Sequence, residues 1–138
     1  MRVILDTNCV ISALVFSKGR MTKFRELWKT EKITPLVNAE TIIELIRVLA
    51  YPKFSLDRAE IEILLGEYLQ FSQICVQNRL PGNTPELADP NDEVFIRLAK
   101  TANPDFLVSG DRHILCLREK YPELNILTPS EFLNKFKL

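Results

Sequence analysis

The chain begins Met1-Arg2-Val3-Ile4-Leu5-Asp6-Thr7-Asn8, a short apolar run that ends on a carboxylate. Such a run is typical of a strand that is buried on both faces, as the strands of a parallel sheet are. In an open α/β sheet, ligands bind in the crevice beyond the carboxyl ends of the strands. The opening strand therefore predicts that Asp6 lies at a ligand-binding edge, where an unpaired buried carboxylate would be costly.

Strand-like and helix-like segments alternate along the rest of the chain, without an internal repeat or a linker. The expected strands are residues 3–5, 33–37, 74–76, 106–108 and 126–127. The expected helices are residues 8–15, 22–30, one from Asn38 to Pro52, one capped by Ser55 or Asp57, one from Asp89-Pro90 to Asn103, residues 113–120, and one opened by the capping box at Thr128. This alternation predicts an α/β three-layer sandwich, in which helices cover both faces of a central, mainly parallel, twisted sheet of about five strands.

Length and composition agree with one compact domain that spans residues 1–138. The hydrophobic content of 46% and the charged content of 26% are ordinary for a globular protein. The formal net charge is zero, so no overall field attracts nucleic acid or membranes, and contact with a polyanion requires a local patch. One basic stretch could supply it, through Lys18, Arg20, Lys23, Arg25 and Lys29. A solvated helix face is the commoner use of such a stretch, and contact with an RNA backbone is the functional alternative.

Cysteine use and the amino-terminal sequence indicate the compartment. Cys9, Cys75 and Cys116 are odd in number, widely spaced and free of CxxC pairing, which is typical of a reducing environment. Asp6 interrupts any apolar core of a signal peptide, and the longest uncharged stretch, residues 7–17, is too short to span a bilayer. We therefore expect a cytoplasmic protein with no membrane partner.

Three further acids fall where the expected fold can bring them near Asp6. Asp111 follows the strand at residues 106–108, Asp92 lies in the first turn of its helix, and Glu44 lies in the second turn of another. Four carboxylates in one pocket would repel one another unless they held a cation. Oxygen ligands without a paired histidine or cysteine favour Mg²⁺ or Mn²⁺ over zinc.

Each acid also has a purely structural explanation. Asp92 could stabilise a helix N-terminus, which is worth roughly 0.3–1 kcal/mol, and Asp111 could cap the helix that follows it. Glu44 could pair with Arg47 on an exposed helix face. Asp6 has the weakest such explanation, because the end of an apolar strand is a poor place for an idle charge.

Four segments of the chain, in order, resemble the acidic motifs of PIN-domain nucleases. DTNCVISAL at residues 6–14 resembles the opening motif, and TIIEL at residues 41–45 matches the segment of the second acid. DPNDEVFI at residues 89–96 and VSGD at residues 108–111 resemble the third and fourth. The resemblance covers essentially the whole chain, and its best subgroup is the bacterial and archaeal PIN proteins described as toxins of toxin–antitoxin pairs, similar to VapC.

The resemblance implies a PIN-like fold and a Mg²⁺- or Mn²⁺-dependent endoribonuclease that leaves a 5′-phosphate and a 3′-hydroxyl. It implies catalytic and metal-binding roles for Asp6, Glu44, Asp92 and Asp111. We assign Asp6 and Asp92 as direct ligands, Asp111 as a direct or water-mediated ligand, and Glu44 as a ligand or general base. Asn8 and Ser109 resemble residues that orient the first and fourth acids. An antitoxin protein is the implied partner beside RNA, and members of the family often form homodimers.

Three alternatives to a metal-dependent nuclease differ in the residues that they need. A haloacid-dehalogenase-like phosphatase needs a second aspartate two residues after the first, and this chain has Asn8 there. A hydrolase could pair His113, the single histidine, with Cys116 or Cys9. A PIN fold could also bind RNA or an antitoxin without cutting, and metal-dependent cleavage distinguishes that module from a nuclease.

Overall fold

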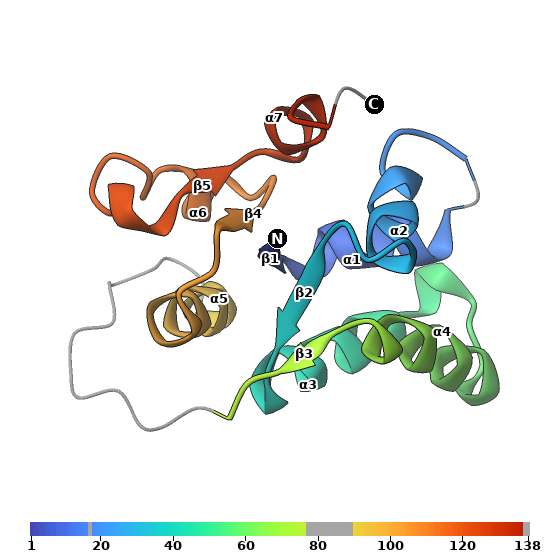
Figure 1. Cartoon of the computed structure of the whole chain (residues 1–138). Helices are drawn as coiled ribbons and strands as arrows, with labels where there is room; N and C mark the ends of the chain where they lie inside the picture. Colours follow the sequence, from blue (N-terminus) through green and yellow to red (C-terminus); the bar gives the residue numbers. More distant parts are fainter. Residues whose placement is uncertain (17, 77–89, 137–138) are drawn as a thin grey trace.

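The structure, a computed structural model, describes residues 1–16, 18–76 and 90–136 (Figure 1). Residues 80–90, whose three prolines, glycine and asparagine predict a loop, fall almost entirely outside these ranges. The side chain of Asp92 is also outside the described part of the structure. The described part contains one sheet of five parallel strands in the order β3-β2-β1-β4-β5. The strands are β1 (Arg2–Leu5), β2 (Thr34–Val37), β3 (Gln73–Ile74), β4 (Phe106–Val108) and β5 (Ile126–Leu127).

The opening strand β1 lies at the centre of the sheet. It pairs with β2 on one side, where Val3 is opposite Pro35, and with β4 on the other, where Leu5 is opposite Val108. The chain runs from β1 outward to β2 and β3, and later returns to the other side of β1 with β4. The order of the strands therefore reverses between β1 and β4, and such a reversal opens a crevice at the carboxyl ends.

Seven α-helices and two short 3₁₀ turns connect the strands in the described residues. The helices are α1 (Thr7–Val15), α2 (Thr22–Lys29), α3 (Ala39–Leu49), α4 (Arg58–Gln70), α5 (Pro90–Ala102), α6 (Arg112–Leu115) and α7 (Pro129–Asn134). The predicted caps are present: the side chains of Asn38, Asp57 and Thr128 each accept a hydrogen bond from a backbone amide in the first turn of α3, α4 and α7.

Alternate residues of β1 point into two different cores. Val3 and Leu5 pack into the core that α1, α2, α3, α4 and α7 cover, whereas Ile4 packs into the core under α5 and α6. In Figure 1, α1 to α4 accordingly lie on one side of the sheet and α5 and α6 on the other. The predicted three-layer α/β sandwich with a five-stranded parallel sheet is thus confirmed, since both faces of the sheet are buried under helices.

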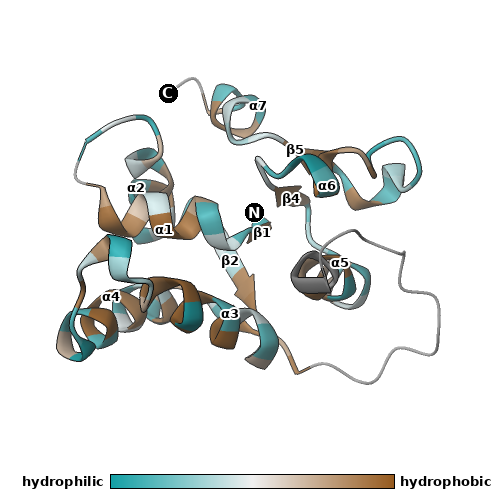
Figure 2. Ribbon diagram, turned by 180° about the vertical axis from the view of Figure 1, so that it is seen from behind, coloured by the Kyte–Doolittle hydropathy of each residue, from teal (hydrophilic) through white to brown (hydrophobic). Residues whose placement is uncertain are grey.

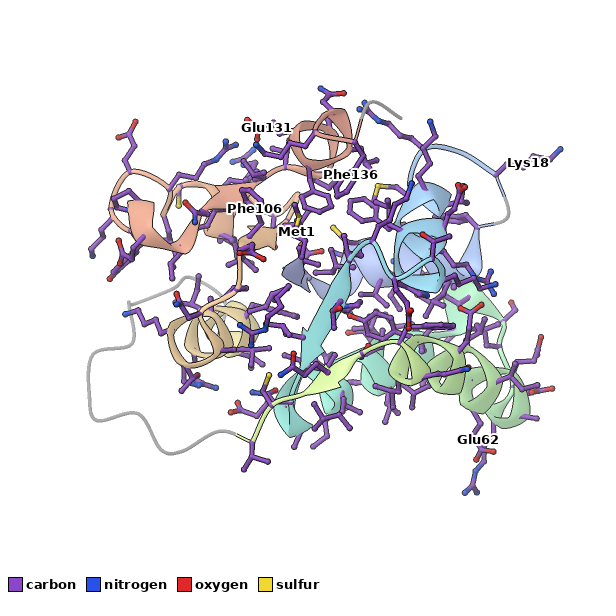
Figure 3. The ribbon with its side chains drawn as sticks, viewed as in Figure 1. Met1, Lys18, Glu62, Phe106, Glu131 and Phe136 are labelled. Carbon is purple, nitrogen blue, oxygen red and sulfur yellow. The ribbon has the colours of Figure 1, made fainter. Side chains whose placement is uncertain are left out.

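An aromatic cluster attaches α7 to the rest of the first core. Phe132 is fully buried and stacks on Phe24 of α2, with ring centroids 5.7 Å apart. It also meets Phe106 of β4 edge-on at 5.9 Å and Phe136 at 5.2 Å (Figure 3). The last helix is therefore held by Phe132, which three other rings surround, together with the fully buried Leu133.

Two helices differ from the sequence expectation. The spacing of Ile42, Leu45, Ile46 and Leu49 predicts an apolar stripe on α3. Ile46 is nevertheless 40% exposed, and Thr41 and Val48 are buried (Figure 2 shows polar and apolar residues alternating along this helix). The helix expected at residues 113–120 ends at Leu115, and turns follow. No helix among the described residues is both long and apolar enough to cross a membrane.

Candidate active site

Asp6 stands at the carboxyl end of the central strand and caps the helix that follows. Its backbone amide donates to the Val108 carbonyl at 3.1 Å, which continues the β1–β4 pairing by one residue. Its Oδ1 accepts from the Cys9 amide at 2.8 Å, and its side chain sits at the N-terminus of α1, where the helix dipole favours an anion. Asp6 is only 4% exposed, so its carboxylate is held in one position rather than solvated.

Ser109 joins the first acid to the fourth. Its Oγ donates to Asp6 Oδ2 at 2.5 Å and accepts from the Asp111 amide at 3.0 Å. Ser109 is fully buried, and its own amide donates to the Leu127 carbonyl of β5 at 3.0 Å. The sequence predicted that Ser109 orients Asp111, and the structure shows that one hydroxyl contacts both acidic residues. That double contact requires the β1–β4 neighbourhood, which no local motif reveals.

Asp111 caps α6 and is more accessible than Asp6. Its Oδ1 accepts from the His113 amide at 2.8 Å and lies 3.5 Å from His113 Nδ1. Its side chain is 31% exposed. The capping role that was the structural explanation of Asp111 is therefore real, and it leaves the second carboxylate oxygen available for another contact.

The two aspartates line the same open depression, whose empty space, including the open solvent at its mouth, is about 520 Å³. Its lining consists of Asp6, Asn8, Cys9, Ser12, Met21, Gly110, Asp111 and Pro129. Asn8 is part of this lining, but the carboxylate contacts of Asp6 in the described structure come from Cys9 and Ser109. Ser12 belongs to the DTNCVISAL segment but had no role assigned from the sequence, although it follows Asn8 by four residues on a helix, a spacing that puts both on one face.

The depression offers hard oxygen donors, which fits Mg²⁺ or Mn²⁺. Each Asp6 oxygen has one hydrogen bond and keeps lone-pair capacity for a cation. Among the described side chains, however, no three histidine, cysteine or acidic groups gather closely enough to hold a metal ion. Two of the four predicted acids are thus brought together, and the side chain of Asp92 lies outside the described residues.

Glu44 has a different partner. Arg47, one turn later in α3, donates from Nη2 to both carboxylate oxygens of Glu44, at 2.9 and 2.8 Å. The hydrogen bond and the charge of Glu44 raise the pKa of Arg47, whose Nη1 also donates to the Tyr51 hydroxyl at 2.5 Å. Glu44 does not line the depression. In this structure it makes the local pair that was its alternative explanation.

The cysteine in the depression, Cys9, has an unreactive thiol. Burial raises the pKa of the Cys9 thiol well above its usual range, and the charge of Asp6 raises it further. The thiol therefore stays protonated at neutral pH and is a poor nucleophile. Cys116 donates to the His113 carbonyl rather than to its ring. The geometry gives no support to a cysteine–histidine hydrolase.

The basic stretch is divided among several partners. Arg25 and Lys29 of α2 both pair with Glu67 of α4, at 2.6 and 3.0 Å. Arg20 donates to the side chains and backbone of α7. No ion pair is formed by Lys18 or Lys23 within the described ranges, and Lys18 extends away from the protein in Figure 3. Contact of these five residues with RNA stays a prediction, with Lys18 and Lys23 the least engaged.

The Glu67 cluster predicts a pH-dependent contribution to stability. Burial opposes ionisation of Glu67, but hydrogen bonds from Arg25 and Lys29 outweigh it and lower the pKa of the carboxyl below its ordinary 4.5. A lowered folded-state pKa adds stability above the unfolded-state value, and the contribution is lost as the pH falls through the folded-state pKa. We expect Glu67→Gln to cost about 0.2–1 kcal/mol at pH 7 and almost nothing in strong acid, as measured by denaturant unfolding.

The matched control is Glu62→Gln in the same helix. Glu62 pairs with Arg58, but both side chains are largely exposed, and Glu62 projects into solvent (Figure 3). Its replacement should change unfolding free energy by less than Glu67→Gln at every pH. Equal losses in the two variants would mean that the Glu67 cluster contributes no more than an ordinary surface pair.

Comparison with known proteins gives a family match and a fold match. A family model described as PIN domain matches residues 2–113. An uncharacterised protein of Methanocaldococcus jannaschii is 27% identical over 143 aligned residues, which cover 99% of this chain and 92% of that protein. A chain from the crystal structure of VapBC2 of Rickettsia felis, bound to a DNA fragment from their promoter, superposes with a TM-score of 0.62. That match has 16% sequence identity and covers 93% of this chain and 98% of the other.

Proposed function

The chain belongs to the PIN-domain family, and from this premise we propose that it is a metal-dependent endoribonuclease that hydrolyses RNA phosphodiester bonds. The observation that carries the proposal is the pair of acidic residues in one depression, Asp6 and Asp111, which Ser109 contacts together. PIN domains are generally nucleases, and this depression lies at the sheet edge where α/β proteins bind ligands.

In the proposed site, Asp6 and Asp92 would bind a Mg²⁺ or Mn²⁺ ion directly, Asp111 would bind it directly or through water, and Glu44 would act as a ligand or general base. A bound ion of this kind polarises a phosphoryl oxygen and makes water a stronger acid. The chain supplies orientation: the Cys9 amide and the Ser109 hydroxyl fix the Asp6 carboxylate before any ion arrives. Participation of Glu44 requires that its carboxylate turn from Arg47, its present partner.

We also propose a protein partner, an antitoxin that covers the depression. The support is the resemblance of the motifs to VapC-like proteins and the fold match to a chain of the VapBC2 complex. Lys18, which is exposed, and Lys23, which is half-buried, would contact either RNA or an acidic segment of such a partner. A gene beside this one that encodes a small protein would identify the candidate.

The test of the nuclease is cleavage of labelled single-stranded or hairpin RNA by the purified protein. We expect cleavage with Mg²⁺ or Mn²⁺, its abolition by EDTA, and restoration when either ion is added in excess. The products should carry 5′-phosphates, which a ligation assay detects. Cleavage that persists in EDTA, or that only zinc supports, would contradict the assignment of an all-oxygen site.

A second candidate is a PIN module that binds RNA or an antitoxin without cutting. The ion pair of Glu44 with Arg47 favours it, because that pair occupies one of the four expected ligands. RNA that binds with a steep salt dependence but stays intact at every Mn²⁺ concentration would establish this alternative and exclude the nuclease.

A further inference from the structure

We propose that Arg20 is a positioning residue that ties together two walls of the depression and so sets its width. One wall is formed by the segment that leads into α2, and the other by the start of α7. The proposal rests on the proposed nuclease function in one respect, namely that RNA binds in this depression. It differs from direct contact of Arg20 with phosphate, which the sequence alone suggested.

The residues that line the depression next to Arg20 come from both walls. Met21 lies on the α2 side and Pro129 on the α7 side. Arg20 immediately precedes Met21, and Ser130 immediately follows Pro129. A hydrogen bond between Arg20 and Ser130 therefore constrains the separation of Met21 and Pro129, because each is the immediate neighbour of a bonded residue.

The guanidinium of Arg20 makes three hydrogen bonds to α7. Nη1 donates to Ser130 Oγ at 3.3 Å, and Nη2 donates to the Ser130 carbonyl at 3.3 Å and to Asn134 Oδ1 at 2.7 Å. The acceptors belong to Ser130 and Asn134, which lie one helical turn apart, and the rigid fork of an arginine can reach both residues together. A lysine ammonium on its flexible stem lacks that fixed geometry, so lysine could not make the same set of hydrogen bonds.

The remaining attachment of α7 explains why this link matters. The stack of Phe132 on Phe24 fixes the buried side of the helix against α2. Arg20 acts on its exposed side, where Ser130 and Asn134 lie, and where Arg118 also pairs with Glu131. The helix has only six residues and follows a strand of two, so few backbone bonds oppose a tilt. Helix α7 can therefore tilt about the stack of Phe132 on Phe24, which acts as a pivot. The hydrogen bonds from Arg20 limit this tilt and fix the position of the Pro129 end.

The experiment compares Arg20→Lys, which keeps the charge, with Asn134→Ala, which removes an acceptor and leaves Arg20 intact. If Arg20 links the two walls through α7, both variants should raise KM for RNA about threefold to tenfold, the equivalent of one lost hydrogen bond, and should change kcat less. The double variant should be no worse than Arg20→Lys alone. If Arg20 instead contacts phosphate, Asn134→Ala leaves KM unchanged, and that result would overturn the proposal.

Amide hydrogen exchange provides a measurement that does not depend on cleavage. Exchange across residues 129–134 should accelerate in Arg20→Lys and in Asn134→Ala, and Asn134→Asp, which keeps an acceptor, should retain the parental rate. Lys23→Ala, which removes a charge from the same stretch, is the matched control and should not alter α7. Parental exchange in both link variants would refute the proposal even if no RNA is cleaved, so its failure is separate from failure of the nuclease.

Discussion

Replacement of Asp6 by asparagine is expected to reduce RNA cleavage by roughly 100-fold or more, the usual scale for loss of one charged or donor group from a catalytic site. The change removes a negative charge at nearly constant volume. Asparagine also caps helices well, so the hydrogen bond from the Cys9 amide can persist. The fold should therefore survive, and the loss should lie in metal binding and turnover.

Two measurements separate that result from unfolding. The far-UV circular dichroism and the melting temperature without metal should match those of the parent, whereas the rise in melting temperature that Mn²⁺ produces should shrink. Asp105→Asn is a suitable control, since Asp105 precedes β4 at the opposite end of the strand and accepts from the Arg2 amide. Full activity in Asp6→Asn would mean that Asp6 is only a helix cap.

Truncation of Phe132 to alanine is expected to destabilise the protein by about 3–5 kcal/mol, the range for large aromatic residues in a core. Phe132 is fully buried, and its ring contacts Phe24, Phe106 and Phe136. The free energy of unfolding of a typical domain is only about 5–15 kcal/mol, so this loss would be a large fraction of it. Urea unfolding followed by tryptophan fluorescence measures it, because Trp28 lies in the same core.

The same chemical change at Phe16 is the control. Phe16 is 53% exposed, and its truncation should alter the free energy of unfolding by less than about 0.5 kcal/mol. If Phe132→Ala were equally mild, the aromatic cluster would not be what attaches α7, and the pivot proposed for the Pro129 wall would lose its basis.

Local patterns predicted the fold well because they depend on near neighbours in the sequence. The apolar run at the start predicted β1, and the N-cap Asn38 and the capping box at Thr128 predicted the starts of two helices. The inner face of α3 was less predictable. Ile46 is exposed, whereas Thr41 is buried. Thr41 can be buried because its hydroxyl is hydrogen-bonded to the Asn38 backbone within the cap and needs no water.

The candidate site was predictable in its acids but not in its connections. Asp6 and Asp111 follow strands that proved to be neighbours, so their proximity could be anticipated from the alternation of elements. The partner of Glu44 could not, because Arg47 competes for the carboxylate from one turn away and a sequence does not rank the two uses. Nor could the sequence foresee that Arg20 meets α7, since that contact spans 114 positions.

The central location of β1 has a consequence for how the protein is made. Asp6 and Ser109 are separated by 103 residues, so the first acid leaves the ribosome long before the serine that fixes it. At a synthesis rate of about 5–20 residues per second, the delay is on the order of 5–20 s. A nascent chain therefore carries no assembled acidic site until most of it has emerged, so the proposed ribonuclease could not cut the ribosome or the message during synthesis.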